Sequence, residues 1–181
     1  MIRFTTRRLV AALALAMLLA GLTLATALAQ PSDLQRARAA TARFNSIQQA
    51  QRAGYVLPPE GPLHECIASL DAGGGAMGFH LINGDLLDTV VDPTKPEALV
   101  YAPDANGKLK LVALEYVVFQ EPWQAEFGPD AMAPMLFGEM FMETDAPNRY
   151  EIPAFYALHA WLWQDNPDGT FESFNRAVSC P

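Results

Sequence analysis

The sequence predicts an α+β fold in which one N-terminal helix packs on an antiparallel sheet. One amphipathic stretch near the start has apolar residues at helical spacing. Several apolar, β-branched segments separated by turn residues follow it, and they read as strands. Between the last two predicted strands lies a proline-rich stretch, which we expect to form a flap over one end of the sheet. A pair of cysteines adds one predicted disulfide.

Residues 1–29 have the pattern of a signal peptide. Arg3, Arg7 and Arg8 precede a long apolar run, and Ala27-Leu28-Ala29 is the small-x-small pattern that signal peptidase accepts. An uncleaved membrane anchor is the alternative, because the run is nearly long enough to span a bilayer. We predict cleavage, no stable membrane insertion afterwards, and a secreted or periplasmic protein.

The remaining residues, 30–181, are numerous enough for a single α+β domain with a sizeable core. Loss of the signal peptide removes three arginines and no acids, so the net charge changes from −8 to −11. An acidic chain without a basic stripe repels nucleic acid and anionic lipid. We therefore expect no nucleic-acid partner.

Cys66 and Cys180 are the two cysteines of the chain, and both lie after the signal peptide. In an exported protein such an even pair predicts a disulfide. It would tie the segment after the first helix to the last residues. Two metal-binding thiolates are the alternative.

Residues 33–53 are predicted to form one amphipathic helix. Ser32 or Asp33 can cap its start, and Gly54 is placed to end it. The apolar stripe is thin and rich in alanine, which predicts a helix lying against a sheet. Its members are Leu34, Ala37, Thr41, Phe44, Ile47 and Ala50.

Four segments are predicted as strands: 76–82, 98–101, 108–119 and 150–164. The second and third flank Asp104-Ala105-Asn106-Gly107, which is a strong hairpin signal. Because the third segment is the longest and most β-branched, we expect it to be a central strand.

The flap, residues 120–153, shows no clean period because prolines interrupt it. It is too apolar for a free linker. It also holds most of the methionines that follow the signal peptide, for which Cu(I) binding together with the histidines and flexible apolar packing are the two interpretations. These methionines are Met132, Met135, Met140 and Met142.

Four stretches carry a resemblance to a family: 75–80, 95–101, 111–118 and 159–171. In them the chain resembles a group of secreted bacterial proteins that have no assigned activity. The resemblance covers about residues 75–175. It implies a shared fold and export, and it implies no particular reaction.

His80, Glu115 and His159 each lie within a strongly apolar predicted strand. A histidine or an ionised glutamate in such a setting costs several kcal/mol unless it has a partner. Two imidazoles and a carboxylate are the ligand set of many metal sites with open positions, so a divalent metal such as Zn, Fe or Cu is one interpretation. Small residues two positions away would leave a hollow around the three groups; they are Gly78, Ala113 and Ala157.

Two alternatives to a metal remain open for this cluster. One is a buried hydrogen-bond network in which Glu115 is ionised and one imidazole is protonated. The other is general acid and base catalysis by the same residues. His64 is either a third imidazole ligand or a histidine of a surface loop.

Our preferred functional prediction is an exported cell-envelope protein with a binding pocket for a small ligand or a metal ion. A small hydrolase, isomerase or lyase is the first alternative, and it requires a cavity beside Glu115 and His159. The second alternative is a partner-binding module without a small ligand. That module requires an exposed apolar patch around residues 132–141.

Overall fold

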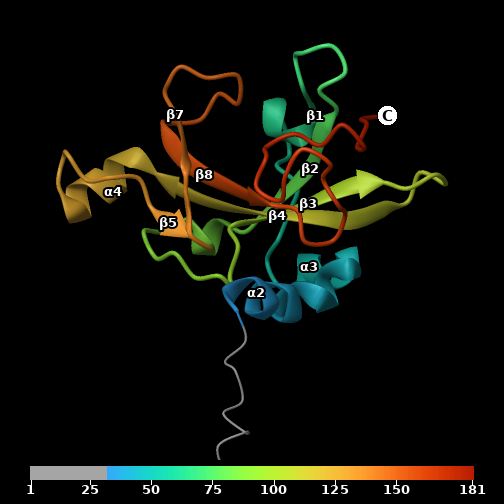
Figure 1. The fold of residues 1–181 in the computed structure, drawn as a ribbon, viewed down its shortest axis with the longest axis horizontal. Helices are drawn as coiled ribbons and strands as arrows, with labels where there is room; N and C mark the ends of the chain where they lie inside the picture. The colour runs from blue at the N-terminus through green and yellow to red at the C-terminus, as the bar shows by residue number, and fades with distance from the viewer. Residues whose placement is uncertain (1–31) are drawn as a thin grey trace, which may run out of the picture. The chain divides into compact units, whose positions relative to one another are not determined.

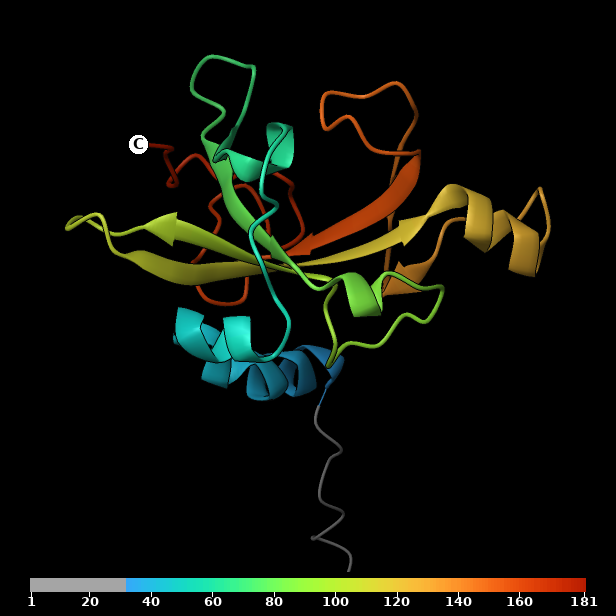
Figure 2. The same ribbon diagram turned by 180° about the vertical axis from the view of Figure 1, so that it is seen from behind.

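A six-stranded antiparallel sheet is the centre of the computed structural model, which describes residues 32–181 (Figures 1 and 2). The predicted signal peptide, residues 1–29, lies outside the described residues. The strand order is β1-β2-β3-β4-β8-β7. The strands are β1 (Ile67–Ala68), β2 (Ala76–Ile82), β3 (Ala98–Pro103), β4 (Leu109–Phe119), β7 (Met142–Thr144) and β8 (Phe155–Ala160).

Strand β4 is the longest and lies between β3 and β8, which confirms the predicted central strand. The predicted β3–β4 hairpin is also confirmed. At its turn Gly107 has a φ of +75°, and its N–H donates to the carbonyl of Asp104 at 2.8 Å. The carboxylate of Asp104 accepts from the N–H groups of Asn106 and Lys108, which pins the turn.

The N-terminal helix is not continuous, so the prediction of one helix over 33–53 is wrong. The structure has α2 (Asp33–Thr41), a 3₁₀ segment η1 (Ala42–Asn45) and α3 (Ile47–Arg52). Ser32 caps α2 with a complete capping box, as its sequence position predicts. The break falls at Ser46, whose ψ of 110° is extended. Through this break the short helices bring Ala37, Phe44 and Ala50 into one buried cluster.

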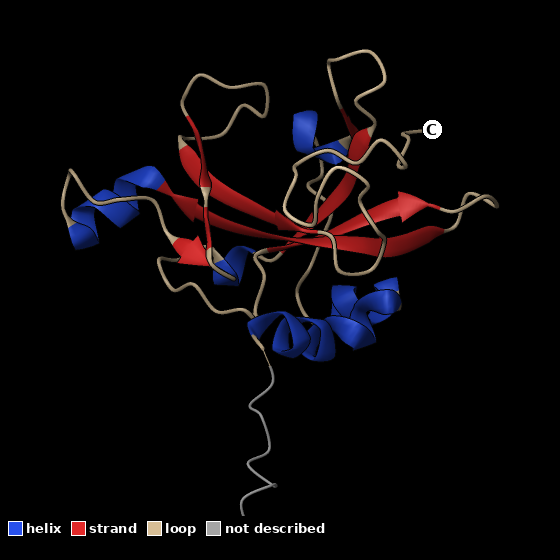
Figure 3. Cartoon of the chain, viewed as in Figure 1, coloured by secondary structure: helices blue, strands red, loops and turns tan. Residues whose placement is uncertain are grey.

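One face of the sheet packs on these helices (Figure 3). Side chains alternate along β3, along β8 and along β4 from Leu114 onward, and every second residue there enters this larger core. A register shift between β3 and β4 interrupts the alternation at Val112. The Tyr101 hydroxyl donates to the carbonyl of Phe44 at 2.5 Å, which ties β3 to η1. The sheet residues of this core are Leu99, Tyr101, Leu111, Leu114, Tyr116, Val118, Tyr156, Leu158 and Ala160.

The opposite face has a smaller core at one end, beneath the C-terminal segment. The predicted Cys66–Cys180 disulfide is present there. Asn175 is fully buried and exchanges two backbone hydrogen bonds with Ala76. A Cβ on Gly75 would lie 2.0 Å from the Asn175 carbonyl oxygen, so the close approach requires glycine. The smaller core consists of Ala76, Val100, Ala102, Val112, Ala113, Trp161 and Val178.

The proline-rich flap contains more regular structure than its lack of period predicts. It comprises α4 (Gln120–Phe127), the two-stranded pair β5 (Met135–Leu136) and β6 (Glu139–Met140), and strand β7, which joins the edge of the main sheet beside β8. Each piece is short, so no period develops along the sequence. Two further 3₁₀ turns, η2 (Pro62–His64) and η3 (Gly84–Leu86), complete the described elements.

Among residues 32–181, no helix has the length and apolar character needed to cross a membrane.

Candidate metal centre

Three strands place His80, Glu115 and His159 on the sheet face opposite the helices. Glu115 of β4 lies directly across from His159 of β8 in the antiparallel register. On β4, the alternate residues Glu115 and Val117 line the same hollow, whereas Leu114 and Tyr116 enter the larger core. The sequence prediction that the three groups share a surface therefore agrees with the structure.

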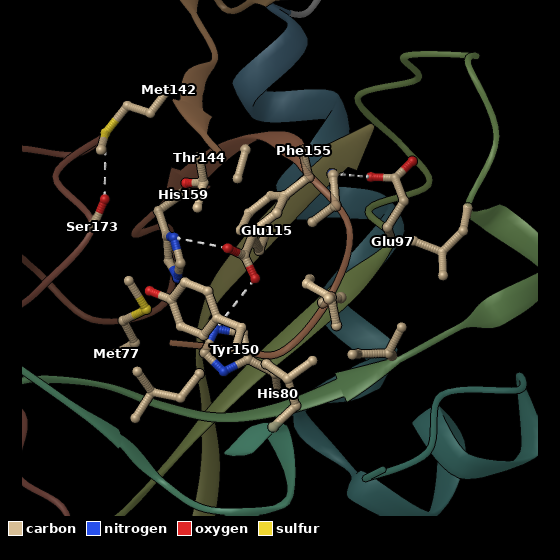
Figure 4. Close-up of a pocket in the computed structure, with 18 of the residues that line it drawn as sticks. Met77, His80, Glu97, Glu115, Met142, Thr144, Tyr150, Phe155, His159 and Ser173 are labelled. Carbon is tan, nitrogen blue, oxygen red and sulfur yellow. Dashed lines mark hydrogen bonds and ion pairs between the residues drawn. The ribbon is translucent and has the colours of Figure 1, made fainter. Parts of the chain in front are cut away.

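The three side chains converge on one another (Figure 4). Glu115 Oε2 lies 3.2 Å from His80 Nε2, and Glu115 Oε1 lies 3.4 Å from His159 Nδ1. The two imidazole rings are nearly perpendicular, with centroids 5.6 Å apart. One ligand atom from each residue lies within 4.8 Å of the other two, which is compact enough for one shared metal ion.

The room for this convergence comes from β3, which was predicted as a strand but not as the strand that separates His80 from Glu115. β3 lies between β2 and β4, so His80 and Glu115 are not on paired strands. The β3 residue opposite Glu115 is Ala98, whose small side chain lines the hollow. His80 therefore reaches Glu115 across Ala98.

The small neighbours named from the sequence have different roles. Ala157 lines the hollow, as predicted. Ala113 instead belongs to the smaller core beneath the C-terminal segment. Gly78 has a φ of +123°, and a Cβ there would lie 2.5 Å from the Tyr101 carbonyl oxygen. Gly78 thus permits a close backbone approach between β2 and β3.

A cavity of about 240 Å³ extends from the cluster. Its walls come from the sheet, the flap and the segment before the C-terminus, and they are mainly apolar. No lysine or arginine is among the lining residues. The apolar walls are Leu63, Ile67, Met77, Ile82, Leu87, Ala98, Val117, Phe119, Met142, Ile152, Phe155, Ala157 and Phe174, and the other lining residues are Glu97, Thr144, Tyr150 and Ser173.

Burial shifts the proton equilibria of the cluster toward neutral forms. The side chains of His80 and His159 are only 2% exposed, and that of Glu115 is 14% exposed. Desolvation lowers the pKa of His80 to about 4 and lowers the pKa of His159 well below its usual value. It raises the pKa of Glu115 to about 8. A network of ionised Glu115 and a protonated imidazole is therefore disfavoured relative to a neutral one.

Several ring nitrogens of the cluster lack hydrogen-bond partners within residues 32–181. These are both nitrogens of His80 and the Nε2 of His159. The approach of Glu115 Oε2 to His80 Nε2 is close, but its geometry is not that of a hydrogen bond. Buried polar atoms are nearly always paired in proteins, so these nitrogens need an explanation. A metal ion would bind one nitrogen of each ring together with the carboxylate, and it would therefore account for one unpaired nitrogen per histidine.

Sequence reasoning missed Glu97, which lines the same cavity. Its side chain is buried, and desolvation raises its pKa to about 8. Its Oε2 accepts a hydrogen bond from the Val117 N–H at 2.9 Å. The sequence signal that could have identified Glu97 is its position directly before the apolar strand β3. Tyr150 and Met77 were also missed, because nothing in their local sequence distinguishes them from core residues.

His64 does not join the cluster. It is exposed, and its Nδ1 lies 2.6 Å from the carbonyl oxygen of Pro58. The interpretation as a surface-loop histidine is therefore the appropriate one.

No protein-family model, no curated protein and no solved structure matches this chain. The candidate centre is therefore defined by its own geometry. The resemblance to a group of secreted bacterial proteins stays a prediction.

Proposed function

We propose that this protein is an exported binding protein of the cell envelope that holds a divalent metal through His80, Glu115 and His159. The observation that carries the proposal is the convergence of two buried imidazoles and a carboxylate at a cavity, where His159 Nε2 has no hydrogen-bond partner among residues 32–181. A small ligand would bind in the cavity above the metal.

The donor set supports a borderline metal. Imidazole nitrogen suits Zn, Cu and Fe, and a single carboxylate with two histidines leaves open coordination positions. Glu115 is placed between the two rings, one oxygen toward each. A metal held by these three residues would therefore face the cavity with its remaining positions.

The cavity walls indicate the chemistry of the ligand. They are mainly apolar, and the described lining residues include no lysine or arginine to pair with an anion. We infer a small, largely apolar ligand that presents one donor atom to the metal. Such pockets bind through apolar contact and obtain specificity from a few polar groups.

Three observations support export. The first residues have a signal-peptide pattern, the Cys66–Cys180 disulfide suits an oxidising compartment, and the sequence stretches named above resemble secreted proteins. The acidic surface also argues against nucleic-acid binding.

The test is the metal content of protein exported to the periplasm of a bacterial host. We expect near-stoichiometric metal that is lost in His80→Ala and in His159→Ala. The exposed His64 provides the matched control, because His64→Ala removes an imidazole outside the cluster. Thermal unfolding with and without a chelator gives the second measurement, since a bound metal stabilises the folded state.

Metal-free protein whose thermal stability does not change on chelation or on metal addition contradicts the proposal. An equal loss of metal in the His64 variant would also contradict it.

An acid–base enzyme is a second candidate, because the cavity that it requires is present beside Glu115 and His159. It predicts turnover of a small ester, amide or isomerisable substrate by metal-free protein. Glu115→Gln should abolish that turnover while leaving the fold intact by circular dichroism. Activity that depends on added metal would favour the metal centre instead.

A further inference from the structure

Four methionines of the flap project into solvent. The exposed fractions are 73% for Met132, 54% for Met135, 51% for Met140 and 56% for Met142. Methionine is commonly a buried residue, and Met77 in the cavity wall is only 6% exposed. Flexible apolar packing, one of the two interpretations drawn from the sequence, therefore does not explain the flap methionines.

The β5–β6 pair brings two of these thioethers together. Met135 lies directly opposite Met140 in the antiparallel register. Side chains of directly opposed residues have Cβ atoms roughly 4.5–5.5 Å apart, so the two thioethers can reach one ion. Leu136 and Phe141 are buried in the larger core and anchor the pair with its methionines facing outward.

Met142 extends this group toward the cavity. Phe141 is buried while Met140 and Met142 are exposed, which is the alternation of an extended chain. Met142 also lines the rim of the cavity, and its Sδ accepts a hydrogen bond from the Ser173 hydroxyl at 3.4 Å (Figure 4). Met135, Met140 and Met142 are called the methionine surface below.

The surroundings of the methionine surface attract cations. Residues 120–148 contain no lysine or arginine. Glu139 and Glu143 are exposed immediately beside Met140 and Met142. Such a one-sided charge distribution raises the local concentration of cations. The acids of this segment are Glu121, Glu126, Asp130, Glu139, Glu143 and Asp145.

We propose that the methionine surface is a binding site for a soft monovalent cation, Cu(I). Thioether sulfur is a soft ligand that selects Cu(I) over hard cations, and the acidic surroundings supply attraction without competing as soft ligands. Its donors are sulfur atoms, whereas the His80, Glu115 and His159 centre offers nitrogen and oxygen, and the two sites approach each other only at Met142 on the cavity rim. An apolar docking patch alone would not require sulfur.

Titration of the mature protein with Ag(I), a redox-inert substitute for Cu(I), tests this proposal. Methionine methyl groups labelled with ¹³C report binding in NMR spectra, and competition with bicinchoninate under anaerobic conditions gives the Cu(I) affinity. We expect near-stoichiometric binding that shifts the methyl resonances of Met135, Met140 and Met142. Loss of an outer-shell partner alone typically costs about 10–100-fold in metal affinity, so Met135→Leu/Met140→Leu should weaken binding by at least that factor.

Leucine keeps the apolar volume and removes the sulfur, so the double variant separates a metal site from an apolar patch. Met132→Leu is the matched control, because it removes an exposed flap thioether that is not part of the methionine surface and should leave binding unchanged. His80→Ala/His159→Ala should also retain the Ag(I) site, which keeps this test independent of the proposed metal centre.

Unchanged Ag(I) affinity in Met135→Leu/Met140→Leu would overturn the proposal. An equal loss in Met132→Leu would do the same. Association with a basic protein that survives both leucine substitutions, without Ag(I) binding, would identify the methionine surface as a protein interface and likewise overturn the cation site.

Discussion

The two faces of the sheet differ in how completely their buried polar groups are hydrogen-bonded. On the helix face, three buried tyrosines each donate to a backbone carbonyl: Tyr55 to Pro96 at 2.8 Å, Tyr101 to Phe44 at 2.5 Å and Tyr116 to Pro93 at 2.7 Å. On the cavity face, the buried rings of His80 and His159 retain nitrogens without a hydrogen-bond partner within residues 32–181. On the helix side, Trp163 Nε1 is the one buried side-chain polar atom without a partner among residues 32–181, whereas the two histidines of the cavity face have three such nitrogens.

This difference indicates that the helix face of the sheet stabilises the fold, whereas the cavity face provides the candidate site. A filled core with paired polar groups stabilises the fold, because both cavities and unpaired polar groups cost free energy. On the cavity face, the cavity and the unpaired polar groups lie at the same place. Residues on the two faces alternate along β4, so neighbouring positions on one strand can be compared directly.

The largest effect is expected on the pH dependence of the free energy of unfolding, and it comes from Glu97 on the cavity face. Burial raises the pKa of Glu97 from 4.5 to about 8. Between these values the unfolded chain loses this proton while the folded protein keeps it. The free energy of unfolding therefore falls as pH rises from about 4.5 to about 8, and by linkage the total contribution amounts to several kcal/mol.

Glu97→Gln should flatten that part of the pH dependence, since glutamine stays neutral and its amide oxygen can still accept from the Val117 N–H. Urea unfolding of chelator-treated protein at several pH values measures the slope. The exposed Glu139→Gln is the control and should leave the slope unchanged. Identical slopes for wild type and Glu97→Gln would show that this carboxyl is not held neutral by burial.

A smaller difference is expected between two adjacent valines of β4. Val118 is 1% exposed and enters the larger core, whereas Val117 lines the cavity. Val118→Ala should lower the free energy of unfolding by roughly 2 kcal/mol, because it removes packed methyl groups and leaves a new void. Val117→Ala enlarges an existing hollow and should cost less than about 1 kcal/mol.

Chemical denaturation of the two valine variants makes the comparison. Both changes remove the same atoms from the same strand, so differences in β-propensity largely cancel. Equal costs at the two positions would mean that the cavity face is packed as tightly as the helix face.

The smallest difference is expected between Tyr101 and Tyr150. Tyr101→Phe removes the hydrogen bond to the Phe44 carbonyl and leaves that acceptor buried, at a cost of about 1 kcal/mol. Tyr150 lines the cavity, and its hydroxyl makes no hydrogen bond within residues 32–181. Thermal unfolding of Tyr150→Phe should match the wild type. A larger loss for Tyr150→Phe than for Tyr101→Phe would reverse the assignment of the two faces.

Much of this architecture is predictable because it depends on local patterns. The turn at Asp104–Gly107, the cap at Ser32 and the alternation along β4 all follow from residues close together in sequence. The disulfide was predictable from the even count of cysteines in a chain with a predicted export signal. The break at Ser46 was not, because helical spacing continues across it while the tertiary core decides where the chain turns.

The candidate site was predictable only in part. His80, Glu115 and His159 are conspicuous as polar residues within apolar strands, and their convergence agrees with that signal. Their spatial arrangement was not available, since His80 and Glu115 meet across β3 and the small residue that separates them is Ala98. Glu97 and Tyr150 reach the same cavity from segments whose local patterns do not mark them.

The amino-acid sequence by itself determined which segments become strands, which residues alternate to each face, and which three polar side chains need partners. These properties depend on side-chain periodicity and on desolvation, and both act on each segment alone. Only the tertiary structure decided that β3 lies between β2 and β4, the strands that carry His80 and Glu115. It also decided that a cavity lies beside these residues and that the flap methionines are exposed. Strand order and cavity shape depend on contacts between distant segments, and no local pattern encodes them.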